Sequence, residues 1–282
     1  MARGSTGVSP AVRLQSCAPR CGMRSYRLAP APALWYIAAM TFQPRGTTVL
    51  PVILTLFPMA FSGCDKGVDT AGHMGTYSTR FSLTEDPISE AKRWINGGTT
   101  GLDWANVATT SGHAIGVPSP VNYTDPTALL AGSWGPDQTV SGVVYSVNQT
   151  EKQYQEVEVR LRSALSAHKC TGYEINFRCL KTANAYTQIV RWNGPVGDFT
   201  YLATRGGPQY GVSDGDVVKA TIAGNVITAY INGVQVAQAT DSTFATGNPG
   251  IGFNANVGNT NVDFGFKSVS VSDNVGASKG GG

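Results

Sequence analysis

The stretch that most restricts the fold runs from Asp216 to Thr240 and reads DVVKATIAGNVITAYINGVQVAQAT. It consists of short runs rich in β-branched residues, with the two-residue alternation of β-strands. Gly224-Asn225 and Asn232-Gly233 interrupt these runs, and Asn-Gly is a preferred two-residue hairpin turn. We therefore predict three short, consecutive strands joined by tight turns.

The same pattern extends upstream. GYEINFRCL (172–180) and AYTQIVRWNG (185–194) alternate apolar with polar residues. The chain has 34 glycines in 282 residues and only 14% charged residues, which suits a turn-rich β protein. We predict one all-β domain over 77–273, built as a two-sheet antiparallel sandwich, with a disordered tail over 274–282.

A further strand, EVEVRLR (Glu156–Arg162), alternates charge with hydrocarbon throughout. Val157, Val159 and Leu161 are expected to face the core, which places the four charged residues together on the opposite face. That charged row is a catalytic site, a sugar-binding surface or a solvated face, and the strand alone does not distinguish these three.

The C-terminal third carries a family resemblance. GDVVKATIAGNVITAYINGVQVAQATDSTFATGNPGIGF, followed by VDFGFKSVSVSD, resembles the closing strands of concanavalin A-like lectin/glucanase jelly rolls, including laminin-G-like and keto-disaccharide-hydrolase-type domains. The resemblance is closest over 215–273 and looser from about 77. It implies a jelly-roll β-sandwich that binds a polysaccharide or oligosaccharide on a concave sheet face. The same fold also carries hydrolases and lyases.

Candidate ligand-binding residues follow from this resemblance. Aromatic rings can stack on sugars while polar neighbours bind hydroxyl groups. The alternative for each tryptophan is a place in the core. The aromatic candidates are Trp94, Trp104, Trp134, Trp192 and Tyr210, with Trp134 and Trp192 preferred because each lies beside a Gly-Pro loop. The polar candidates are Arg160, Arg162, Glu174, Asn176, Arg178 and Gln188.

Two enzyme signatures are matched in part. EVEVR resembles the Glu-x-Asp-x-Glu motif of laminarinase-type glucanases, which implies a nucleophilic role for Glu156 and a supporting one for Glu158. Arg160 stands where the acid/base belongs, and arginine cannot deliver a proton in the catalytic range. Glu158–Arg162 and Gln188–Val190 resemble alginate-lyase strands, but Val190 replaces their histidine. Our leading interpretation is a carbohydrate-binding protein. A hydrolase using Glu156 and Glu158, a lyase using Arg160 and Arg162, and a structural or adhesion module are the alternatives.

The N-terminal 63 residues have the features of processed sequence. They contain six arginines and no lysine, Asp or Glu, so the formal charge of +3 becomes about −3 from Cys64 onward, which excludes a basic nucleic-acid footprint. A thirteen-residue apolar run (49–61) precedes Ser-Gly-Cys64, an arrangement that resembles a bacterial lipobox.

We predict a lipoprotein signal peptide with a true start at Met40, lipidation at Cys64, a flexible tether over 64–76 and an envelope or extracellular location. The membrane would then be contacted through the lipid alone. An Arg-rich organelle transit sequence and a plain secretory leader are the alternatives.

Cysteine and metal chemistry give fewer constraints. Cys170 and Cys179 form a possible disulfide in an oxidising envelope, and two unpaired buried thiols are the alternative. No cofactor is expected, since the chain has no Cys-x-x-Cys and its three histidines are scattered. A structural calcium at Asp263 or Asp273, which the resemblance implies, and plain surface aspartates are equally compatible with the sequence.

Overall fold

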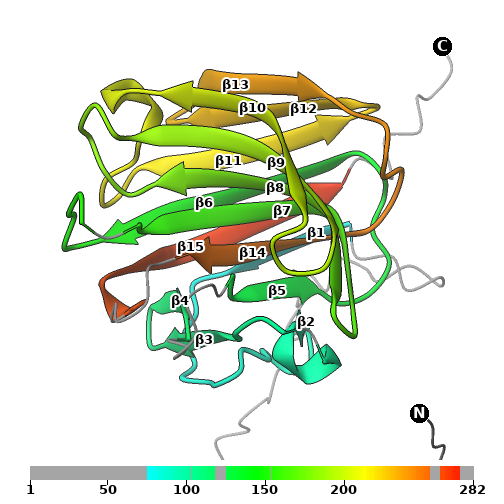
Figure 1. Ribbon diagram of the computed structural model, residues 1–282. Helices are drawn as coiled ribbons and strands as arrows, with labels where there is room; N and C mark the ends of the chain where they lie inside the picture. The colour runs from blue at the N-terminus through cyan, green and yellow to red at the C-terminus, as the bar shows by residue number, and fades with distance from the viewer. Residues whose placement is uncertain (1–74, 102, 118–124, 153, 255–260, 274–282) are drawn as a thin grey trace, which may run out of the picture. The chain divides into compact units, whose positions relative to one another are not determined.

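The computed structural model describes residues 75–101, 103–117, 125–152, 154–254 and 261–273. Within these ranges the chain forms fifteen β-strands and three short 3-10 turns, η1 (Gly98–Thr100), η2 (Pro208–Tyr210) and η3 (Asn261–Asp263). The strands pair into two antiparallel sheets that lie against each other as layers (Figure 1). The predicted all-β, two-sheet antiparallel jelly-roll sandwich is therefore confirmed.

The eight-stranded sheet has the order β13-β12-β11-β6-β15-β4-β3, with β1 paired to β15. Its strands are β13 (Val234–Thr240), β12 (Val226–Ile231), β11 (Val217–Ala223), β6 (Gln138–Ser146), β15 (Phe264–Asp273), β4 (His113–Gly116), β3 (Val107–Thr110) and β1 (Thr76–Thr79). The seven-stranded sheet has the order β10-β9-β8-β7-β14-β5-β2. Its strands are β10 (Phe199–Gly206), β9 (Tyr186–Gly194), β8 (Lys169–Arg178), β7 (Glu156–Ser166), β14 (Asn248–Asn254), β5 (Thr127–Leu130) and β2 (Trp94–Asn96).

The turn chemistry behaves as the sequence predicts. Ala223 pairs with Val226 and Ile231 with Val234, so both connections are two-residue turns. At the second of these turns Asn232 and Gly233 have φ values of 50° and 81°, the left-handed region that a type I′ turn requires.

The core lies between the two sheets. The seven-stranded sheet contributes Val157, Val159 and Leu161, and the eight-stranded sheet contributes residues such as Val140 and Phe266, all 0% exposed. The inward face of β7 is therefore the predicted one. Because side chains alternate along a strand, Glu156, Glu158 and Arg160 lie on the outer face of the seven-stranded sheet.

The predicted leader, tether, lipidation site at Cys64 and tail fall outside the described residues, apart from the last tether residues 75 and 76. Of the described residues, none forms a helix long and apolar enough to cross a membrane.

Candidate functional site

A group of polar side chains covers the outer face of the seven-stranded sheet, and we call it the outer network. Strand pairing brings its members together, since β7, β8 and β9 are consecutive neighbours and β14 flanks β7. Its members are Glu156, Glu158 and Arg160 on β7, Glu174, Asn176 and Arg178 on β8, Tyr186, Gln188 and Trp192 on β9, and Asn254 on β14. The structure thus joins six of the eight predicted ligand-binding residues, and both predicted glutamates, in one group.

The centre of the outer network is a guanidinium held between two carboxylates. Arg160 is 2.6 Å from Glu158 Oε2 and 2.7 Å from Glu174 Oε2. The Trp192 indole N–H also donates to Glu174. Arg160 and Glu158 are 0% exposed and Glu174 is 4% exposed, so the interpretation of this row as a solvated face is wrong. Buried charges of this kind are stable only when paired, because desolvation of each ion is costly.

A glycine on the neighbouring strand makes room for the Glu158–Arg160 pair. A Cβ atom at Gly252 would lie 2.3 Å from Glu158 Oε2 and 2.9 Å from an Arg160 nitrogen. Gly252 pairs with Glu158 across the β14–β7 ladder. The Gly-Ile-Gly segment of β14 therefore has a direct part in this site, because any side chain at 252 would displace the ion pair.

Glu156 is the centre of a second set of contacts. The Tyr186 hydroxyl donates to one of its oxygens, and Asn254 Nδ2 donates to the other at 3.0 Å. Beside it, the Arg178 guanidinium lies 4.4 Å from the centre of the Tyr154 ring, a cation–π distance. The strand register places Glu156 opposite Arg178.

Burial controls the protonation of both glutamates. It raises the pKa of Glu158 well above its ordinary value, helped by the nearby carboxylate of Glu174 and only partly opposed by Arg160. Burial also raises the pKa of Glu156, although hydrogen bonds from Tyr186 and Asn254 oppose it. For Arg160, burial alone would lower the pKa, but Glu174 and Glu158 raise it, so this guanidinium stays charged.

Aromatic rings continue from the outer network toward solvent. Trp104 lies 4.4 Å from Trp192, Trp192 lies 5.1 Å from Phe199, and Phe199 lies 5.2 Å from Tyr201, all between ring centres. Trp104 and Trp192 are buried, whereas Tyr201 is 55% exposed. Tyr201 pairs with Val190 on β9, which places its side chain on the same face. Burial and the charges of Glu156, Glu174 and Asp125 raise the pKa of Tyr201.

The exposed rings of this region were missed by the sequence analysis, which favoured tryptophans. Tyr154, 46% exposed, and Tyr201 are the two large exposed aromatic side chains of the described residues. A signal for Tyr201 was present, since Phe199 and Tyr201 alternate directly after the Gly-Pro turn that ends β9. Trp94, Trp104, Trp134 and Trp192 are at most 7% exposed, so each packs as a core residue.

Arg162 does not belong to the charged row, which corrects its predicted place. The pairing of β7 with β8 shifts register between Leu161 and Ala164, and Arg162 has φ of 45° at this bulge. Its guanidinium instead donates to the backbone carbonyls of Pro136, Phe244 and Gly224. Arg162 therefore ties loops of the eight-stranded sheet to β7 and is not available to a ligand on the outer network.

The predicted platform residue Trp134 is also elsewhere. It belongs to the core between the sheets, and its indole N–H donates to the Ala131 carbonyl. It therefore lies outside the group that β7, β8 and β9 form.

The predicted Cys170–Cys179 disulfide is wrong. Both thiols are free and buried; Cys170 lies at the start of β8 and Cys179 directly follows its last residue. Nine residues of extended strand separate their Cα atoms by about 30 Å, whereas a disulfide requires less than about 7 Å. Burial raises the pKa of each thiol to about 12.

The two aspartates suggested for calcium are separated by the length of β15. Asp263 accepts a hydrogen bond from Asn148, and Asp273 accepts one from the Gly135 amide. Within the described ranges, no three His, Cys, Asp or Glu side chains are grouped as a metal site would need. A calcium site at either residue remains a prediction.

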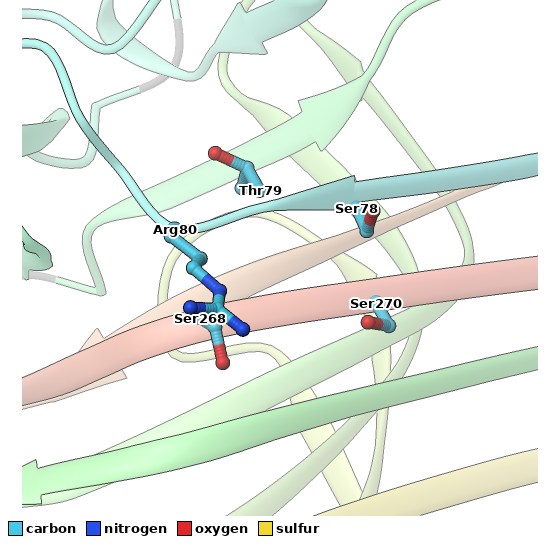
Figure 2. Close-up of a pocket in the computed structure, with 5 residues that line it drawn as sticks. All are labelled: Ser78, Thr79, Arg80, Ser268 and Ser270. Carbon is cyan, nitrogen blue, oxygen red and sulfur yellow. The ribbon is translucent and has the colours of Figure 1, made fainter.

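The opposite sheet offers a different kind of surface. An open hollow on the eight-stranded sheet is lined by Arg80 and by four hydroxyl side chains on β1 and β15 (Figure 2). The hydroxyl residues are Ser78, Thr79, Ser268 and Ser270. The hollow contains no aromatic ring, so it lacks the stacking surface that Tyr201 gives the outer network.

No family model and no curated protein matches the chain. Solved structures that resemble it include the carbohydrate-binding module CBM66 from Bacillus subtilis, at 17% identity and a TM-score of 0.44, covering 66% of this chain and 96% of that one. The potassium-bound carbohydrate recognition domain of Emp46p has 15% identity and a TM-score of 0.48, covering 70% and 96%. LamAcat from Zobellia galactanivorans has 10% identity and a TM-score of 0.44, covering 70% and 96%.

Proposed function

We propose that this β-sandwich is a carbohydrate-binding protein that holds a polysaccharide or oligosaccharide on the outer face of its seven-stranded sheet. The observation that carries the proposal is the pair of exposed rings, Tyr154 and Tyr201, beside a buried and internally paired polar network. Fixed polar side chains beside exposed aromatic rings suit sugar recognition, since the rings stack on the C–H faces of a sugar while the polar groups orient its hydroxyls.

The partly exposed members of the outer network are suited to contact such a ligand. Tyr186, Gln188 and Asn254 are intermediate in exposure, so their polar ends are accessible at the edge of the buried centre. Asn176 donates to Gln188 at 3.2 Å, which links this rim to the side chains below. The rim would therefore bind hydroxyl groups while the buried ion pairs hold its geometry.

The test is binding of the whole chain to a panel of neutral and acidic polysaccharides, measured by affinity electrophoresis and calorimetry. We expect Tyr201→Ala to weaken binding about tenfold, which corresponds to about 1.4 kcal/mol, because one stacking ring is lost. Tyr230→Ala is the matched control, since Tyr230 lies on the eight-stranded sheet and contacts Lys219. Equal affinities for the two variants would remove Tyr201 from the binding face.

A second candidate function is cleavage of the polysaccharide. Burial raises the pKa of Glu158, and the Arg160 guanidinium contacts both Glu158 and Glu174, so two carboxyl groups flank one arginine. Mass spectrometry of the soluble products decides this. Oligosaccharides that have gained water indicate hydrolysis, and unsaturated ends indicate elimination. If neither product forms and one polymer retains the protein, the result supports binding alone. If neither product forms and no polymer retains the protein, the result supports the structural or adhesion alternative.

We further propose that the protein is anchored in a bacterial envelope through lipid on Cys64, with the β-sandwich outside the membrane. The support is the apolar run and the Ser-Gly-Cys sequence at 62–64. Expression in a bacterium with radiolabelled palmitate should label the protein, and Cys64→Ala should abolish the label and release the protein to the soluble fraction. Cys170→Ala controls for other thiols, and label that persists in Cys64→Ala would contradict the anchor.

A further inference from the structure

We infer that the outer network selects uncharged glycans, read through their hydroxyl groups, and rejects polyuronates. This inference rests on the proposed carbohydrate-binding function and names the ligand class of the same site. It differs from what the alginate-lyase resemblance of Glu158–Arg162 and Gln188–Val190 implies, since alginate is a polyuronate.

The first argument is the balance of charge. Four carboxyl groups, Asp125, Glu156, Glu158 and Glu174, meet two guanidinium groups, Arg160 and Arg178, and all six side chains are at most 4% exposed. Asp125 belongs with them because it is buried just before β5, which pairs with β14 beside β7, and its charge acts on Glu158 and Arg160. At their formal charges, four carboxylates outnumber two guanidinium groups, so this set of groups offers no excess of positive charge to an anionic ligand.

The second argument is that the cations are already engaged. Arg160 is held by Glu158 and Glu174. Arg178 lies over Tyr154 and donates to the Glu151 carbonyl. Arg162 is turned to the loops of the other sheet. None of these three guanidinium groups therefore presents the open fork that bidentate recognition of a carboxylate uses.

The third argument is the hydrogen-bonding capacity that remains. Buried atoms of this region without a hydrogen-bond partner include the acceptors Glu158 Oε1 and Asn176 Oδ1 and the donors Arg160 Nε and Trp104 Nε1. Buried polar groups strongly favour a partner. A hydroxyl group both donates and accepts, whereas an ionised carboxylate only accepts, so hydroxyls match this mixed set.

The experiment compares matched polymers on the unsubstituted whole chain. Each neutral polysaccharide of the panel is tested before and after oxidation of its C6 hydroxyls to carboxylates, and alginate and polygalacturonate are included. We expect at least one neutral polymer to bind and its oxidised form to bind at least tenfold more weakly. Equal or tighter binding of the oxidised form, or binding of a polyuronate alone, would overturn the inference and leave the proposed function standing. If no polymer binds in either form, the proposed function fails and the inference fails with it.

A charge variant tests the cause. Glu158→Gln keeps the shape of the side chain and removes its negative charge wherever Glu158 is ionised. At a pH above the raised pKa of Glu158, we expect the variant to reduce the discrimination against the oxidised polymer at least threefold. Asp214→Asn removes one charge from the other sheet, where Asp214 pairs with Lys267, and should leave the discrimination unchanged. Thermal melts establish that both variants fold. Unchanged discrimination in folded Glu158→Gln would contradict the electrostatic origin, and the polymer comparison stands without either variant.

Discussion

At the scale of single residues, Glu158 shows how burial changes the meaning of a charged side chain. The folded chain retains a proton on Glu158 at pH values where the unfolded chain has already lost it, because burial and Glu174 raise the pKa in the fold. The resulting stabilisation is complete below the ordinary glutamate pKa of about 4.3 and is lost as the pH rises through the raised value. Glu156 has a shift in the same direction.

We predict that Glu158→Gln removes part of this pH dependence. The free energy of unfolding of the unsubstituted chain should fall from pH 5 to pH 8 more steeply than that of the variant, since glutamine has no proton to lose. Urea titrations at the two pH values measure both slopes. Asp241→Asn is the control, because the pKa of Asp241 shifts in the opposite direction. Burial alone would raise this pKa, but hydrogen bonds from Tyr173 and Thr243 lower it to about 2. The stabilisation from Asp241 is therefore lost only in acid. Parallel slopes for Glu158→Gln and the unsubstituted chain would contradict the prediction.

Trp192 gives the second prediction at this scale. It is 1% exposed and contacts Trp104, Phe199 and Glu174, so it supports the outer network from within. Trp192→Ala should reduce the free energy of unfolding by about 3–5 kcal/mol, the usual cost of removing a large buried ring. Trp192→Phe retains a ring and should cost less. A fully stable Trp192→Ala with weakened glycan binding would instead restore the platform role that the sequence suggested.

At the scale of secondary-structure elements, the bulge in β7 determines which charges share a face. It turns Arg162 away from Glu156, Glu158 and Arg160, and glycines on both flanks make it possible. A Cβ atom at Gly172 would lie 2.5 Å from the Ser163 Cα, and one at Gly247 would lie 2.3 Å from the Arg162 carbonyl carbon. Both glycines also have positive φ, 126° and 146°.

We expect Gly172→Ala to destabilise the fold by at least about 2 kcal/mol, because overpacking against backbone adds to the strain of a left-handed residue. Gly215→Ala is the matched control: its φ is 80° but an added Cβ meets no atom within 4 Å, so only the backbone strain remains. Chemical denaturation measures both variants. An equal loss of unfolding free energy in the two variants would mean that the close contact at the bulge adds nothing to the backbone strain.

The elements themselves were largely predictable, and the bulge was not. Strand alternation and the Asn-Gly turn are local properties, so the sequence predicted β8, β9 and the β11–β12–β13 meander. The bulge depends on Gly172 and on Gly247, 75 positions further along the chain, which become neighbours only after the sheet has formed. A strictly alternating strand therefore placed Arg162 on the wrong face.

At the scale of the whole molecule, the candidate site also depends on contacts between residues that are distant in the sequence, and these contacts could not be predicted. The sequence identified Glu156, Glu158, Arg160, Glu174 and their neighbours, because register within a hairpin follows from alternation. It could not show that these side chains are buried, since their burial needs Trp104 from a distant loop and the space left by Gly252 on β14. It also favoured tryptophans as platforms, whereas large apolar rings filled the interior and two tyrosines remained exposed.

The pairing of β1 with β15 brings Gly75 and Asp273 within hydrogen-bond distance, with the Asp273 amide donating to the Gly75 carbonyl at 2.9 Å. The β1–β15 ladder decides how the domain responds to tension. It runs from Thr76 opposite Ser272 to Thr79 opposite Val269. A pull between Gly75 and Asp273 opens that pair first and then each following pair in turn, as a zipper opens, so the load is never shared by the whole ladder. The force that frees β1 is therefore small, and the two sheets behind it carry load only after that strand has been peeled away.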